Sequence, residues 1–192
     1  MLRKIFFDIE TSNIFSDVGK ADPVLLDLSV VGIYDSDDNQ YRTFLEKDLP
    51  SLWPILEKTD LLIGFNSEHF DIPLLNKYYP GELTQIRSLD ILKEIKSSYG
   101  RRMKLEQIAE ATLGTNKTGD GLIASRWWKE GEFQKVIDYC LEDVKITKQI
   151  YDFALENRHL KFKEGGQIIT IPLDTSHWEE TNDSKLTHTL PF

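Results

Sequence analysis

The chain has 192 residues, of which 40% are hydrophobic and 29% are charged, and its formal net charge at neutral pH is −9. This length and balance predict one globular domain with a full core, or one domain with a short appendage. The excess of acid argues against a protein that coats DNA without regard to sequence, because such a protein needs a basic surface. It does not exclude an enzyme that acts on nucleic acid.

The sequence also bounds where the protein works. No apolar run approaches the ~20 residues that a membrane helix needs. Acidic residues interrupt the N-terminal stretch, where a secretory signal would need an apolar region of roughly 7–15 residues. Cys140 is the single cysteine, which excludes an internal disulfide and suits a reducing compartment. We therefore expect a cytoplasmic protein that does not enter a membrane.

The first half of the chain predicts strands and helices in mixed order. Strands are expected at residues 3–10, 25–35, 40–46 and 60–66. Helices are expected at 51–59, where Ser51 can cap the first turn and Pro54 is tolerated, and at 72–79. Residues 86–92 fit a strand or a helix equally well.

The second half is mostly helical. A helix is predicted over 104–114, with Gly114 as its stop, and another over 132–158, where apolar residues follow one stripe. A hairpin over 161–173 turns at a Gly-Gly pair. Together these elements predict an α/β domain over 1–158, with a mixed central sheet flanked by helices. A C-terminal hairpin and a poorly structured tail are expected over 159–192.

Two acids at the end of the first strand are the first sign of function. Side chains alternate along a strand, so Asp8 and Glu10 point to the same face. Two like charges in an apolar setting are costly unless they are protonated or paired with a cation. The stretch therefore predicts a metal ion, with further ligands from elsewhere in the chain.

Further acids lie on other predicted elements. Asp71 stands at the start of a helix directly after a buried strand, where an N-terminal helix cap is the simpler interpretation. Tyr139 and Asp143 are four residues apart on the long helix, so they share one face. Taken singly, Asp143 is typical of a solvated or rim position and Tyr139 of a core position.

Taken together, these residues resemble a known family. Asp8-x-Glu10, Asn66-x-x-x-Phe70-Asp71 and Tyr139-x-x-x-Asp143 are similar to the three exonuclease motifs of the DEDD superfamily. These are 3′–5′ exonucleases with the ribonuclease H-like fold, and they include polymerase proofreading domains. The resemblance spans about residues 3 to 155. Tyr139, in place of a histidine at position 138, matches the tyrosine-type (DEDDy) branch. The stretches over 104–114 and 117–133 further resemble stand-alone YprB-like predicted exonucleases.

The resemblance implies a mechanism. Two divalent cations, Mg²⁺ or Mn²⁺, would be held by four carboxylates and would drive phosphodiester hydrolysis at a 3′ end of DNA or RNA. It assigns Asp8 to both ions, Glu10 and Asp143 to the nucleophile side, and Asp71 to the second ion. Tyr139 would orient the attacking water. The residues do not distinguish DNA from RNA, and a preference for single strands is fold-level analogy.

Other residues are candidates for substrate binding, each beside a plainer alternative. The family places Thr11 against the terminal nucleotide, although Thr also suits a strand end. Phe70 stacks on a base or packs in the core, and Asn66 touches substrate or organises its loop. Basic candidates for phosphate binding are Arg101, Arg102, Lys104 and Lys117, with a solvated loop as the alternative for the first three. Trp127 and Trp128 are candidates for a stacking platform.

Two other functions compete. The stretch over 6–12 is a near match to the nucleophile motif of haloacid-dehalogenase-type phosphatases, and 118–121 echoes their late acidic loop, but the motifs around Asp71 and Asp143 stay unexplained. A ribonuclease H-like module that binds nucleic acid or protein without catalysis is the second alternative. The apolar end of the tail is a candidate for docking a partner protein, and a disordered terminus is the plainer interpretation.

Overall fold

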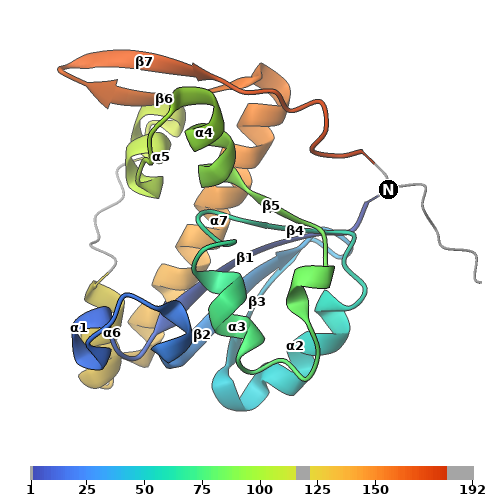
Figure 1. Cartoon of the computed structure of the whole chain (residues 1–192), viewed down its shortest axis with the longest axis vertical. Helices are drawn as coiled ribbons and strands as arrows, with labels where there is room; N and C mark the ends of the chain where they lie inside the picture. Colours follow the sequence, from blue (N-terminus) through green and yellow to red (C-terminus); the bar gives the residue numbers. More distant parts are fainter. Residues whose placement is uncertain (1, 116–121, 181–192) are drawn as a thin grey trace, which may run out of the picture.

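A five-stranded mixed sheet forms the centre of the protein. The structure, a computed structural model, describes residues 2–115 and 122–180. The sheet has the order β3-β2-β1-β4-β5. β1 pairs antiparallel with β2 and parallel with β4, so it occupies the middle of the sheet (Figure 1). The strands are β1 (Lys4–Thr11), β2 (Leu28–Asp35), β3 (Gln40–Leu45), β4 (Leu61–Gly64) and β5 (Ser88–Asp90).

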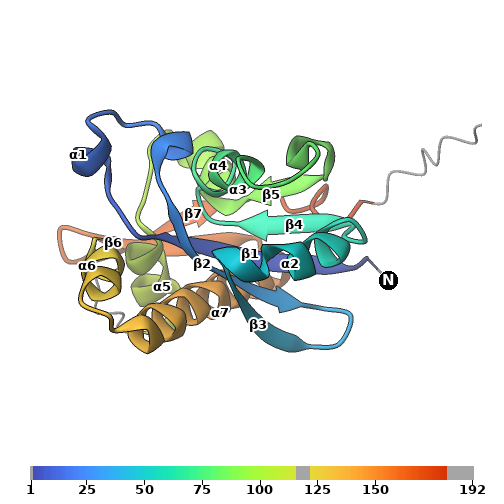
Figure 2. The same ribbon diagram turned by 90° about the horizontal axis from the view of Figure 1, so that it is seen from below.

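Helices cover both faces of this sheet. α2 (Leu49–Leu56) and α3 (Asp71–Asn76) pack on one face. The long α7 (Phe133–Asn157) packs on the other, together with α5 (Leu105–Leu113) and α6 (Ile123–Lys129). Figure 2 shows α7 and α3 on opposite sides of the strands. This is the predicted α/β architecture, a mixed central sheet flanked by helices.

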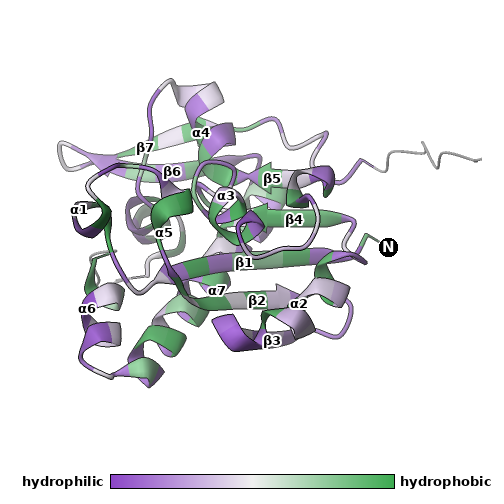
Figure 3. Ribbon diagram, turned by 60° about the horizontal axis from the view of Figure 1, so that its bottom comes forward, coloured by the Kyte–Doolittle hydropathy of each residue, from purple (hydrophilic) through white to green (hydrophobic). Residues whose placement is uncertain are grey.

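β1 is buried on both faces, which sets where its acids point. Ile5, Phe7 and Ile9 belong to the core between the sheet and α2 and α3. Phe6 faces the other way, into the core beside α7. Because side chains alternate, Asp8 and Glu10 continue the row of Phe6 toward α7. Figure 3 shows the central strands as a largely hydrophobic layer.

The predicted C-terminal hairpin is present and packs on the domain. β6 (His159–Glu164) and β7 (Gln167–Pro172) form a separate two-stranded sheet. Gly165 and Gly166 make its turn with φ of 56° and 80°, as a two-residue hairpin turn requires. The next residues are ordered against the same core, where the buried Trp178 stacks on Tyr151 with ring centroids 5.3 Å apart. The rest of the tail lies outside the described residues.

Apart from shifts of a few residues at the ends of other elements, the structure departs from the predicted elements in three places. Residues 23–25 form a 3₁₀ turn, so β2 begins later than predicted. The ambiguous stretch over 86–92 holds the whole of β5 and the start of α4 (Ile91–Tyr99). Two short helices were not predicted, α1 (Phe15–Val18) and α6. None of the helices in the described parts of the chain is both long and apolar enough to cross a membrane.

Candidate active site

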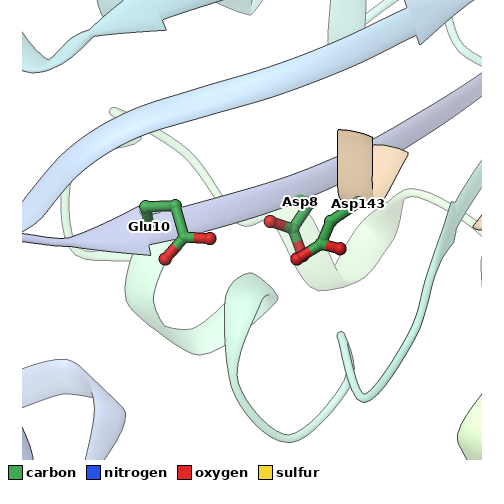
Figure 4. Close-up of side chains that lie close together, drawn as sticks. All are labelled: Asp8, Glu10 and Asp143. Carbon is green, nitrogen blue, oxygen red and sulfur yellow. The ribbon is translucent and has the colours of Figure 1, made fainter. Parts of the chain in front are cut away.

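Three of the four predicted acids converge at one point beside the sheet. Asp8 and Glu10 come from β1 and Asp143 from α7, and one carboxylate oxygen of each lies within 4.8 Å of the others (Figure 4). Glu10 and Asp143 are buried, with exposed fractions of 8% and 7%. Three carboxylates this close repel one another when ionised, so the cluster favours a bound cation.

A glycine of β2 allows α7 to approach the sheet closely beside this cluster. Gly32 of β2 pairs with Asp8 in the sheet. A Cβ atom on Gly32 would lie 2.9 Å from the Cys140 sulfur and 3.1 Å from the Cγ2 of Val144. The Cys140 thiol in turn donates to the backbone oxygen of Asp8 at 3.4 Å. Burial, followed by the nearby acids, raises the pKa of this thiol well above its ordinary value.

The fourth acid, Asp71, lines the same cavity and is tied to β1. Its carboxylate accepts a hydrogen bond from the backbone amide of Ile9 at 3.1 Å, and the residue is only 4% exposed. Asp71 is the first residue of α3, and Phe70 is the N-cap, so Asp71 is not the helix cap of the simpler interpretation. Burial, and then the charge of Asp90, raise the pKa of Asp71 to about 8. The cavity has a volume of about 740 Å³ and also includes the three clustered acids and Tyr139.

Asp90 supports the site from outside the lining of the carboxylate cavity, and the sequence analysis missed it. It is buried at the end of β5, and its carboxylate accepts hydrogen bonds from the backbone amides of Asn66 at 2.8 Å and Glu68 at 3.1 Å. It also caps α4, accepting from the amide of Leu92 at 2.9 Å. Asp90 therefore fixes the loop that leads to Asp71. An aspartate directly before a helical pattern is a cap signal, so the sequence could have revealed the capping of α4 but not the bonds to the loop.

The two tryptophans of α6 turn to different surroundings. Trp127 packs edge-on against Tyr139, with ring centroids 6.0 Å apart. Trp128 packs against Phe133 at 4.7 Å. The pair therefore does not form one joint stacking surface. Trp127 instead supports the ring of Tyr139, which lines the cavity one helical turn before Asp143.

The structure brings most of the predicted substrate-binding residues to the cavity. Its wall includes Thr11, Asn66, Phe70, Arg102 and Lys104. The Asn66 backbone is left-handed, with φ of 68°, and its side-chain oxygen accepts from the Arg102 guanidinium. Asn66 therefore bonds to Arg102 and also lines the cavity, and its role in organising the loop stays a prediction.

One of the predicted basic residues, Arg101, is not brought there. Arg101 pairs with Glu164 of the hairpin at 2.7 Å, and its guanidinium lies 5.1 Å from the centre of the Phe162 ring. It does not line the cavity that Arg102 lines. Lys117 lies outside the described residues.

A mixed sheet whose central strand carries two acids, with a third from the long helix packed on it, defines a ribonuclease H-like domain with a candidate metal site. The family model described as RNase_H superfamily matches residues 5–155. The chain therefore belongs to the RNase H superfamily.

Two DNA polymerases are among the individual proteins similar to this chain. DNA polymerase 3 of Saccharolobus shibatae is 24% identical over 155 residues, which cover 78% of this chain and 18% of the polymerase. The family B DNA polymerase of the hyperthermophilic archaeon Pyrobaculum calidifontis superposes with a TM-score of 0.63 and 18% identity, over 81% of this chain and 25% of the polymerase. This chain thus spans no more than a quarter of either polymerase.

Proposed function

We propose that the protein is a 3′–5′ exonuclease of the tyrosine-type DEDD branch, close to the stand-alone YprB-like group. Its substrate is the 3′ end of single-stranded DNA or RNA. The observation that carries the proposal is the cluster of Asp8, Glu10 and Asp143 in the lining of one cavity. Asp71 and Tyr139 line the same cavity, so all residues of the three motifs face one space.

The donor set fits hard divalent cations. The clustered ligand atoms are carboxylate oxygens, which suit Mg²⁺ or Mn²⁺ rather than a thiol- or imidazole-binding metal. Asp8, Glu10, Asp143 and Asp71 would hold two such ions. When bound, the ions supply an acidified water as nucleophile and positive charge for the transition state.

The remaining residues hold and orient the substrate. Because a phenol is protonated at neutral pH, Tyr139 orients the attacking water by its hydroxyl and is not the base. Thr11, Phe70 and Asn66 contact the terminal nucleotide from the cavity wall, and Arg102 and Lys104 contact phosphates. The ion pair with Glu164 argues against such a role for Arg101, and that of Lys117 rests on the sequence alone.

A labelled-strand assay tests the proposal. Single- and double-stranded DNA and RNA, labelled at the 3′ or the 5′ end, are incubated with Mg²⁺ or Mn²⁺ and sampled over time. A 3′ label released first as a mononucleotide, with a 5′-labelled ladder that shortens stepwise, supports a 3′–5′ exonuclease. Asp152→Asn is a matched control on α7, because its exposed carboxylate pairs with Lys148 away from the cavity.

The competing functions make different predictions. The phosphatase interpretation is wrong, because the chain belongs to the RNase H superfamily. A non-catalytic binding module would leave every labelled strand intact in the presence of Mn²⁺. The retention of all four acids around one cavity argues against such a module. Cytoplasmic location and docking of a partner by the tail stay predictions.

A further inference from the structure

A second cavity opens beside the carboxylate cavity, between the β4–α3 loop and α4. It has a volume of about 250 Å³, and we call it the α4 pocket. Its lining includes the basic side chains of His69, Lys93, Lys96 and Arg102. Asn66, Leu92 and Arg102 line both cavities, so the two are continuous along this wall.

The α4 pocket is cationic in a protein whose net charge is −9. Lys93 is neutralised by Glu68, with their charged atoms 2.5 Å apart. Asp90 also lines the pocket, and the backbone amides of Asn66 and Glu68 that donate to its carboxylate partly offset its negative charge. Within residues 2–115 and 122–180, no carboxylate lies at ion-pair distance from Lys96 or Arg102. These two cations are exposed and therefore available to an anion.

The geometry points to a backbone phosphate of the nucleic-acid strand as the ligand of the α4 pocket, held by Lys96 and Arg102. This inference rests on the proposed function. Metal ions in the carboxylate cluster would neutralise only the phosphate that is cleaved. Each further nucleotide brings another phosphate close to the anionic cluster, and that phosphate needs cations from the protein.

Arg102 is already placed to contact a phosphate in the α4 pocket. One of its terminal nitrogens donates to the Asn66 side-chain oxygen, which holds the guanidinium at the boundary of the two cavities. A guanidinium has five N–H donors, so others remain for phosphate oxygens. Lys96 adds a mobile point charge from the next turn of α4 beyond Leu92.

The opposite side of the site has a different chemistry. A cavity of about 450 Å³ beyond Ser12 is walled by Leu28, Leu45, Trp128 and Phe133. Its two charged residues, Glu46 and Lys47, have opposite signs. This side offers apolar surface without net positive charge. We therefore assign the remaining phosphates of the nucleic acid, beyond the one that is cleaved, to the α4 pocket and not to this apolar cavity.

Binding of a single strand as a function of salt tests this assignment. Fluorescence anisotropy of a labelled hexanucleotide is measured in Ca²⁺, over a series of salt concentrations, for the full chain, for Lys96→Gln and for Lys58→Gln. Lys58 is an exposed lysine after α2 and serves as the charge-matched control. For single strands each lost phosphate contact lowers the slope of log K against log salt by about 0.7. We expect that reduction, with about fivefold weaker binding at low salt, in Lys96→Gln and not in Lys58→Gln.

Hydrolysis adds a second measurement. A dinucleotide carries only the phosphate that is cleaved, whereas a hexanucleotide also carries phosphates that could reach the α4 pocket. We therefore expect the hexanucleotide to have the lower KM in the unaltered protein, and the difference between the two KM values to be smaller in Lys96→Gln. Equal salt slopes for Lys96→Gln and the unaltered protein would overturn the inference that the α4 pocket binds a phosphate. If the unaltered protein still cleaves the strands in that case, the exonuclease proposal stands. If the unaltered protein neither binds nor cleaves the strands, the proposed function itself fails, and the α4 pocket with it.

Discussion

The carboxylate of Asp71 accepts a hydrogen bond from the backbone amide of Ile9, the residue between the two acids of β1, at 3.1 Å. This contact joins the N-terminus of α3 to the middle strand of the sheet. It places Asp71 in the wall of the cavity that holds Asp8 and Glu10. The amide favours an ionised Asp71, whereas burial and the charge of Asp90 raise its pKa to about 8.

Metal-free stability should therefore fall as the pH rises. In the folded protein without metal, Asp71 keeps its proton up to about pH 8, whereas the unfolded chain releases it near pH ~4. Between these values the folded state binds more protons, so the free energy of unfolding decreases with pH. In EDTA, Asp71→Asn should flatten this part of the Tm profile and raise the Tm near pH 9 by about 5 °C. An unchanged slope in the variant would contradict the assignment.

Removing one acid of the cluster should separate activity from stability. Asp8→Asn and Asp143→Asn should each lower the cleavage rate on the order of 10³-fold, which corresponds to ~4 kcal/mol. Their Tm in EDTA should stay equal or rise, because one repelling charge is gone. Asp152→Asn should keep activity and lose less than about 1 kcal/mol. Activity near that of the unaltered protein in either cluster variant would refute the metal assignment.

Loss of the Tyr139 hydroxyl should have a milder effect. Tyr139→Phe keeps the ring that packs against Trp127, so folding should be unaffected. We expect kcat to fall about tenfold, or ~1.4 kcal/mol, with KM unchanged, because only the orientation of the water is lost. A complete loss of cleavage would mean that the hydroxyl does more than orient the water.

Filling the space beside Gly32 should disturb both the packing of α7 and the activity of the site. Gly32→Ala places a Cβ against the Cys140 sulfur and should cost about 1–3 kcal/mol by overpacking. Cleavage should fall as well, because the displaced helix carries Asp143. Adding Cys140→Ala removes the sulfur and should recover ~1 kcal/mol relative to the sum of the single changes. Thermal unfolding and cleavage of all three variants complete the cycle, and strictly additive effects would rule out this coupling.

Asp90 should act on the site through the loop that it holds. Asp90→Asn keeps the shape of the side chain but replaces one acceptor with a donor, so the amides of Asn66 and Glu68 cannot both be satisfied. We expect the Mn²⁺ concentration for half-maximal cleavage to rise about tenfold. Asp35→Asn is the matched control, because this buried carboxylate holds Arg3 through a 2.6 Å ion pair. If both variants shift the Mn²⁺ requirement equally, Asp90 has only a structural role.

Local patterns were enough to predict the sheet and its flanking helices, but not every boundary. Asp90 ends β5 and also caps α4, so residues 86–92 carry a strand pattern and a helix start within one short stretch. Before β2, the side chain of Asp22 caps a 3₁₀ turn that starts at Pro23, and the apolar residues after it looked like strand. α6 buries only Ala124 and Ser125, so its helical form depends on packing against α7.

The acids were predictable because their spacing is local. Asp8 and Glu10 share a face by the strand period, and Tyr139 and Asp143 by the helix period. The separation of Arg101 from Arg102 was not predictable in this way. Adjacent arginines look alike in sequence, and their directions differ because Arg101 has Glu164 of the distant hairpin as its partner. Asp90 was missed because its backbone partners become neighbours only in the folded sheet.

The position of Trp178 determines where a recombinant fragment of this domain can end. Its ring is fully buried, and Arg87 donates to the backbone oxygen of His177 at 2.7 Å, which anchors the segment beside the sheet. A recombinant fragment that ends with α7 would leave Tyr151 without its stacking partner and would expose the apolar surface under the hairpin. An autonomously folding unit must therefore include the chain through Trp178, and a fusion partner is best joined beyond it.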